Sequence, residues 1–187
     1  MVNLKHFEAD KVSLATEKTK LKKGFDTLFV KYDGNDLTFQ TPWMKMPFDP
    51  DDHENGRRAF SLNCPSGDFK TTMKSLDDKI VELLKARSAE VFNRTAISDE
   101  FLDINHSPII RNGKEYSDKI KFKSDKKTLF FENKKVIDDP DVCRGDEVRA
   151  IIKVNYVWIN KNKFGMTLMA KQFEYRKTDD EECSLSD

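Results

Sequence analysis

The sequence predicts a mainly β fold with one long α-helix, an α+β class. Short β-rich runs recur along most of the chain, and only residues 70–92 carry a long apolar stripe of helical period. Three strand segments precede this helix and further strand segments follow it. This order is typical of an OB-like antiparallel barrel, here elaborated with an extra hairpin. The length of 187 residues suits one domain with a sizeable core.

The first two strands are predicted at residues 26–32 and 36–41, which are rich in β-branched and aromatic residues. The Asp-Gly-Asn sequence at 33–35 predicts a compact hairpin turn between them. Two prolines within residues 42–47 exclude regular ladder pairing there, except at a sheet edge or a bulge. A third, short strand is predicted at residues 59–62.

The long helix is predicted from apolar residues that recur at three- and four-residue steps. Met73, Leu76, Ile80 and Leu84 lie on one stripe, and neither Gly nor Pro interrupts residues 70–92. We therefore expect one uninterrupted helix with a single face against the core. Residues 93–114 are predicted to be a polar connection.

The remaining strands follow that connection. Residues 116–123 alternate apolar residues with lysines, which predicts a half-buried strand. Residues 128–132 and 135–137 form a second predicted hairpin, and residues 147–159 and 163–175 form the longest one. On the first strand of the long hairpin, the alternation predicts one apolar face, made by Val148, Ala150, Ile152, Val154, Tyr156 and Trp158.

Charge divides the chain into three parts: a basic N-terminal arm at 1–24, an OB-like domain at 25–176 and an acidic, disordered tail at 177–187. The chain has 33 Lys and Arg against 33 Asp and Glu. The last nine residues hold five of these acids and no base, so the rest of the chain carries 33 bases against 28 acids. The tail is interpreted either as a solvated terminus or as a segment that competes with nucleic acid for a basic surface.

The sequence lacks the residues that several classes of function require. His6, His53 and His106 are not at metal-ligand spacing from one another or from a cysteine. The acidic stretch at 49–54 lacks the spacing of a calcium loop and is expected to be a solvated loop. We found no phosphate-cradling glycine loop and no nucleophile elbow. The sequence therefore predicts no enzyme activity, no metal site and no cofactor.

Sequence features also bear on the compartment. The chain has no apolar run long enough to span a membrane, and its N-terminus lacks the apolar stretch of a signal peptide. Its three cysteines are odd in number and widely spaced, which is typical of reduced thiols. We therefore expect an intracellular protein in a reducing compartment, with no membrane partner.

The remaining pattern with a chemical meaning is the alternation of aromatic residues with Lys and Arg on predicted strands. Single strands of nucleic acid are held in this way, because bases stack on aromatic faces while a basic groove follows the phosphates. The candidate nucleic-acid-binding residues are Trp43, Lys45, Arg57, Arg58, Phe60, Tyr116, Lys119, Lys121, Lys123, Arg149, Lys153, Lys161 and Lys163.

Structural explanations compete with this interpretation. Trp43 lies between prolines and is either a stacking platform or a loop anchor. The lysines of residues 119–123 are equally typical of a solvated sheet face or of an edge strand guarded against aggregation. A set of aromatic residues on apolar faces is expected in the core: Phe29, Phe39, Phe122, Tyr156, Trp158 and Phe164.

Four segments resemble a family of single-stranded DNA-binding proteins of nucleocytoplasmic large DNA viruses. They are LFVKYDGNDLTFQTPWMKMPF at 28–48, RRAFSLN at 57–63, YSDKIKFK at 116–123 and RGDEVRAIIKVNYVWINKNKFGMTLMAKQFE at 144–174. The last is the most specific, through Gly145, Val148 and Arg149 at the start of the strand, Trp158 near the hairpin tip, and Lys163, Phe164 and Gly165 on the return strand.

The resemblance implies an OB-like core and a non-catalytic protein that coats single-stranded DNA during viral replication or recombination. It implies a host cytoplasmic viral factory, the nucleus or the virion as the location. The acidic tail is expected to modulate access to the DNA surface or to contact replication proteins, and a homo-oligomer is left open. The alternative is a virion structural or assembly protein that uses the same β-core as a protein interface.

Overall fold

The computed structural model describes residues 1–21, 24–53, 56–113, 117–138 and 140–178. Its α-helices are α1 (Asp68–Ala86), α2 (Ser88–Phe92) and α3 (Asp99–Asn105), and two short 3-10 helices lie at Leu4–His6 and Ala9–Lys11. The strands are β1 (Val12–Leu14), β2 (Thr19–Lys20), β3 (Asp26–Tyr32), β4 (Asn35–Gln40), β5 (Met44–Lys45), β6 (Asp51–His53), β7 (Arg57–Asn63), β8 (His106–Ser107), β9 (Ile110–Arg111), β10 (Lys119–Lys123), β11 (Leu129–Glu132), β12 (Lys135–Ile137), β13 (Glu147–Asn160) and β14 (Lys163–Arg176).

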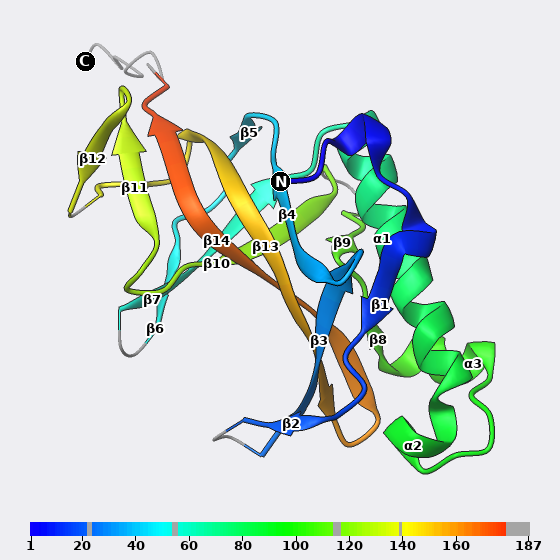
Figure 1. Ribbon diagram of the computed structural model, residues 1–187. Coiled ribbons are helices and arrows are strands. Elements are labelled where there is room, and N and C mark those ends of the chain that lie inside the picture. Colours follow the sequence, from blue (N-terminus) through cyan, green and yellow to red (C-terminus); the bar gives the residue numbers. More distant parts are fainter. Residues whose placement is uncertain (22–23, 54–55, 114–116, 139, 179–187) are drawn as a thin grey trace.

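The three predicted hairpins are confirmed. β3 pairs with β4, β11 with β12, and β13 with β14, each in antiparallel register. Positive φ angles at Asp33 and Gly34, and at Asn133 and Lys134, give the first two hairpins the backbone twist that tight two-residue turns need. The two long strands β13 and β14 run through the centre of the molecule and connect its two halves (Figure 1).

The structure departs from the predicted OB-like antiparallel barrel in two respects. Along its main path the described sheet runs β1-β3-β4-β13-β14-β10-β7-β6, and its two ends do not pair with each other, so the sheet is open. The sheet is also mixed, because β14 pairs in parallel with β8, β10 and β11. The fold is therefore mostly β with few helices, in an open and curved mixed sheet.

The predicted helix at 70–92 is interrupted. α1 ends at Ala86, Arg87 turns the chain, and α2 begins at Ser88. The guanidinium of Arg87 donates hydrogen bonds to the carbonyl oxygens of Ala15 and Thr16 at 2.8 and 2.6 Å, which ties this turn to the N-terminal segment. The connection at 93–114 was also predicted without elements, but it contains α3, β8 and β9.

The core lies between the concave side of the sheet and the buried face of α1. That face carries Phe69, Met73, Leu76, Ile80 and Leu84, each 3% exposed or less. Figure 1 shows α1 beside β1 at one side of the sheet, with β11 and β12 at the opposite side.

The segment expected as a basic arm packs on this body where it is described. The backbone N–H of Val2 donates to the Thr38 carbonyl at 2.8 Å, and Val12 is buried in the core. The acidic stretch expected as a loop contributes β6, which pairs with β7. The acidic tail lies outside the described residues beyond Thr178.

Two bulges shape the central hairpin. The register between β13 and β14 shifts between Ile151 and Ile152, and again between Val154 and Tyr156. The second shift exchanges the faces of β13, so that Val157 and Ile159 enter the core while Tyr156 and Trp158 become half-buried on the other side. The prediction that Tyr156 and Trp158 share the core face with Val148 is therefore wrong.

Candidate nucleic-acid interface

The outer face of the hairpin is the side of β13 and β14 that points away from the core. Arg149 and Ile151 lie on it from β13, and Gln172 and Glu174 lie directly opposite them on β14. None of these four side chains is fully buried. Because β13 also pairs with β4 and β5, residues from the segment 40–45 reach the same face.

Trp43 is held at one end of this face by two arginines. The guanidinium carbon of Arg149 lies 4.8 Å from the Trp43 ring centroid, and that of Arg176 lies 4.5 Å from it. Both arginines are also ion-paired across the hairpin: Arg149 to Glu174 at 2.6 Å and Arg176 to Glu147 at 2.5 Å. Trp43 is half-buried, so it is both a packed residue and a partly accessible ring.

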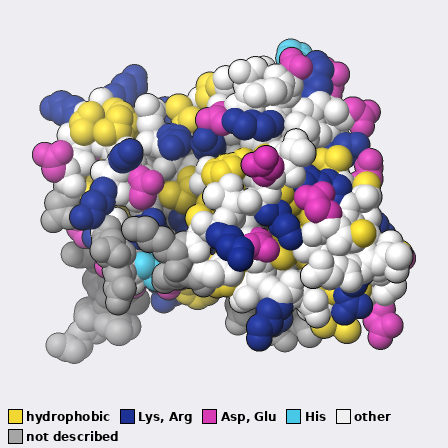
Figure 2. Space-filling view, turned by 60° about the horizontal axis from the view of Figure 1, so that its bottom comes forward, with side chains coloured by type: hydrophobic (Ala, Val, Ile, Leu, Met, Phe, Trp, Pro, Cys, Tyr) yellow, Lys and Arg dark blue, Asp and Glu magenta, His cyan; other side chains and the backbone are white. Residues whose placement is uncertain are grey.

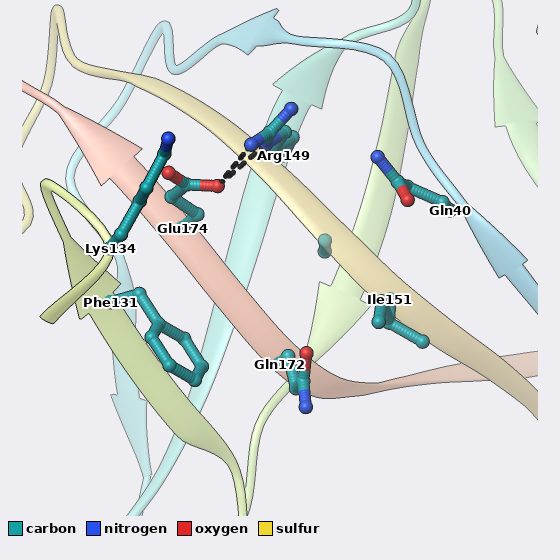
Figure 3. Close-up of a pocket in the computed structure, with 8 residues that line it drawn as sticks. Gln40, Phe131, Lys134, Arg149, Ile151, Gln172 and Glu174 are labelled. Carbon is teal, nitrogen blue, oxygen red and sulfur yellow. Dashed lines mark hydrogen bonds and ion pairs between the residues drawn. The ribbon is translucent and has the colours of Figure 1, made fainter. Parts of the chain in front are cut away.

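A cleft of about 300 Å³ opens beside this cluster. Figure 3 shows the Arg149–Glu174 pair and Lys134 along one side, Phe131 at the left, and Gln172 and Gln40 at the bottom and right. An aromatic ring, two cationic groups and two amides therefore surround one opening. This combination offers stacking, phosphate contact and hydrogen bonding to base edges within one site.

A second aromatic group lies at the other end of β13. Tyr156 is opposite Phe29 on β3, with the ring centroids 6.3 Å apart in an edge-to-face arrangement. Phe29 is 37% exposed, and Trp158 is half-buried opposite Thr27. Between the two aromatic groups, Lys153 extends from the outer face to Asp36 at 2.5 Å.

The predicted lysines of β10 lie on another part of the sheet. Lys119, Lys121 and Lys123 alternate with the buried Ile120 and Phe122, as predicted. Lys121 pairs with Asp51 at 2.6 Å, and the Lys119 ammonium lies 4.2 Å from the Phe48 ring centroid. None of the three lines the cleft on the hairpin.

The other predicted residues are divided between the core, the surface and the undescribed part of the chain. Phe60 is 0% exposed and packs against Phe173, with 4.5 Å between ring centroids, so a base cannot reach its ring. Arg58 pairs with Asp52 at 2.9 Å. Lys45, Arg57, Lys161 and Lys163 are exposed, and Tyr116 lies outside the described residues.

Carboxylates accompany several of the candidate cations. Arg149, Lys153, Lys121 and Arg58 each have an acidic partner within 3.0 Å. Hydrogen bonds from Lys153 and Lys31 hold the pKa of Asp36 below its usual value, and the hydrogen bond from Lys121 does the same for Asp51. Figure 2 shows the result on one side of the molecule, where Lys and Arg side chains are spread among Asp and Glu rather than gathered in one basic patch.

The structure adds candidate interface residues that the sequence reasoning missed. They are Phe131, Lys134, Gln172 and Arg176, together with Phe29, Tyr156 and Trp158, which had been assigned to the core. One signal for the last group is present in the sequence. Apart from Ile151, the aliphatic residues of β13 change from even positions (Ala150, Ile152, Val154) to odd positions (Val157, Ile159), which indicates a bulge between them.

Within the described ranges, no group of three or more His, Cys, Asp or Glu side chains is arranged to hold a metal ion. Among the same residues, none of the helices is long and apolar enough to cross a membrane.

The structure described so far is an open, mixed β sheet. Its outer face carries aromatic residues and ion-paired basic residues. A solved structure of similar fold is the crystal structure of gp2.5, a single-stranded DNA-binding protein encoded by bacteriophage T7. It has a TM-score of 0.52 and 17% identity, over 74% of this chain and 85% of that chain. At this identity the likeness shows a shared fold.

The single-stranded DNA-binding protein from bacteriophage Enc34 gives a TM-score of 0.48 and 13% identity, over 94% of this chain and 96% of that chain. Its complex with single-stranded DNA gives a TM-score of 0.48 and 14% identity, over 89% and 98%. No protein-family model matches the chain, and no curated protein matches it in sequence. The resemblance to the family of large DNA viruses therefore stays a prediction.

Proposed function

We propose that this protein binds single-stranded DNA, without strong sequence preference, across the outer face of the β13–β14 hairpin. The observation that carries the proposal is the arrangement along β13. An arginine-bound Trp43 and the cleft with Phe131 lie toward one end, Lys153 lies in the middle, and Tyr156 and Trp158 lie toward the other end.

The dimensions of this face suit a short single strand. Arg149 and Trp158 are nine positions apart on β13, which corresponds to about 30 Å of strand. OB-type folds hold about 4–16 nucleotides each, with aromatic rings contributing roughly 1–3 kcal/mol per stacked base. The shared fold with gp2.5, which is itself a single-stranded DNA-binding protein, supports the same proposal.

The finer parts of the proposal rest on the family resemblance and on the charge of the sequence. The protein is non-catalytic and acts in viral DNA replication or recombination, and its acidic segment beyond Thr178 competes with DNA for the basic residues or recruits replication proteins. Five acids and no base in the last nine residues support this role. A homo-oligomer on DNA is compatible with this mode of binding.

A fluorescence-anisotropy titration of a labelled 30-nucleotide oligo(dT) against the protein, repeated over a salt series, tests the function. We expect the logarithm of the affinity to fall with the logarithm of salt, at about −0.7 per contacted phosphate. A duplex of the same length should bind more weakly, because its bases are not free to stack. Absence of binding to the single strand in low salt would refute the proposal.

The variants Lys153→Gln and Trp158→Leu should each weaken binding of the single strand. Lys85→Gln on α1 is a matched control for the charge change, because Lys85 is an exposed lysine paired with Asp99 on a different element from this face. If the protein binds no DNA but forms stable assemblies by light scattering, the alternative of a virion structural protein is favoured.

A further inference from the structure

The two arginines on Trp43 are occupied by the protein's own carboxylates. Arg149 donates from Nε to Oε2 of Glu174 at 2.7 Å and contacts the same oxygen from Nη2 at 2.6 Å. Arg176 donates from Nε to Oε2 of Glu147 at 2.7 Å and from Nη2 to the same oxygen at 2.5 Å. Each guanidinium thus presents to a carboxylate the fork of N–H groups that would otherwise grip a phosphate.

The register of the hairpin places the two members of each ion pair directly opposite each other. Glu147 lies directly opposite Arg176, and Arg149 lies directly opposite Glu174, two positions along the same face. The four charges therefore alternate around one end of the hairpin and sum to zero, with the Trp43 ring over both guanidiniums. The carboxylates are only 29% and 21% exposed, so the pairs are sheltered on the side of the sheet.

The arginines, in contrast, keep contact with solvent. The side chain of Arg176 is 54% exposed and that of Arg149 is 34% exposed. A pair between partly exposed side chains is held by about 0–1 kcal/mol, which is small enough for another anion to replace one partner. A phosphodiester that approaches Trp43 meets guanidiniums already oriented by packing on the ring.

We propose that the Trp43–Arg149–Arg176 cluster is a phosphate subsite of the DNA surface, and that Glu147 and Glu174 are resident competitors for it. In the free protein each carboxylate holds its arginine in place and neutralises it. On binding, a backbone phosphate takes over guanidinium N–H groups from the carboxylate. The carboxylates thereby lower the affinity and make release faster, while they keep the arginines ordered. This inference rests on the proposed function, and it assigns the regulation of DNA binding to Glu147 and Glu174.

The test uses the full chain and the same oligo(dT) titration. Glu174→Gln and Glu147→Gln keep the shape of the side chain and remove its charge. Each should raise the affinity about two- to fivefold at low salt, the range that corresponds to one surface ion pair. The slope of the salt dependence should stay close to that of the parent protein, because the phosphate that contacts the arginine is already bound in the parent complex. Glu100→Gln, which removes a charge on α3, should change neither quantity.

A double variant separates this mechanism from a general charge effect. If Glu174→Gln acts by releasing Arg149, it should give no gain in an Arg149→Gln background. A gain that persists there, or a loss of affinity in the single variants, would overturn the inference while leaving the proposed function intact. Failure of the unaltered protein to bind the oligonucleotide would instead overturn the proposed function itself.

Discussion

Gly165 on β14 is the position where a single methyl group should disturb both the fold and the proposed DNA surface. A Cβ added there would lie 2.8 Å from the carbonyl oxygen of Ser107, 2.9 Å from Cζ2 of Trp158 and 3.0 Å from Cβ of Ser107. Ordinary contacts between such atoms are about 3.5–4.0 Å, so all three overlap. The Ser107 oxygen cannot yield easily, because β8 pairs with β14 at this residue.

The Trp158 ring is the neighbour that can move. Forcing an extra methyl group into a packed site costs about 1–3 kcal/mol. We therefore expect Gly165→Ala to lower the free energy of unfolding by about this amount and to displace Trp158 from its place on the outer face. Urea unfolding followed by far-ultraviolet circular dichroism measures the first effect, and the emission spectrum of Trp158 in a Trp43→Phe background reports the second.

A cycle with Trp158→Phe tests the reasoning atom by atom. Phenylalanine lacks Cζ2, so Gly165→Ala should cost less in that background, with a coupling of about 0.5 kcal/mol or more. The contacts with Ser107 remain and should keep part of the cost. Equal costs in the two backgrounds, or a Gly165→Ala protein within about 0.5 kcal/mol of the parent, would refute the steric argument.

Three further predictions concern the core, the interface and a buried thiol. Phe60→Ala should lower the free energy of unfolding by about 3–5 kcal/mol in urea, since the ring is fully buried; lower DNA affinity with unchanged stability would show that the ring stacks on bases after all. The only two tryptophans, Trp43 and Trp158, lie toward opposite ends of the proposed interface, so DNA should quench each of the single-Trp variants Trp158→Phe and Trp43→Phe; quenching of only one would shorten the interface. Burial raises the pKa of the Cys64 thiol to about 11, so with Cys143 and Cys183 replaced by Ser it should resist alkylation at pH 8. Because the unfolded thiol ionises near 8.5, stability should fall as the pH rises from about 9 to 11, and a flat stability curve there would contradict the assignment.

The parts of the fold that the sequence predicts well are those set by local chemistry. The Asp-Gly pair at 33–34 and the alternation of β13 and β14 depend on near neighbours, and the three hairpins appear where expected. Closure of the sheet depends on whether β1 and β6 meet, and no local pattern reports it. The break at Arg87 was missed for a similar reason, since its guanidinium is held by carbonyl groups of residues 15 and 16, far away in sequence.

The sequence predicted some of the residue types of the candidate site but not how those residues are arranged. Trp43, Arg149 and Lys153 lie on the outer face, but their partners come from strands whose register the residue types alone do not state. Phe60 shows the opposite error, because an aromatic residue beside two arginines in sequence points into the core from the strand. The chain as a whole has no net charge, which taken alone argues against a polyanion partner. The Arg149–Glu174 and Arg176–Glu147 pairs on this face are neutral as well.

The two bulges of the central hairpin explain how candidate residues come to lie on the outer face at both of its ends. Counting outward from the turn between Asn160 and Lys163 without any bulge places Arg149 opposite Glu174, and the structure has this pairing. The pairing is kept because the two bulges cancel. Lys171 is an extra residue on β14, between the partners of Ile151 and Ile152, and Asn155 is an extra residue on β13. One bulge alone would shift every later pair by one position and separate the arginines from their carboxylates. With both, the outer face of β13 carries charged residues at one end and aromatic residues at the other, while Val148, Ile152, Val154, Val157 and Ile159 all stay in the core.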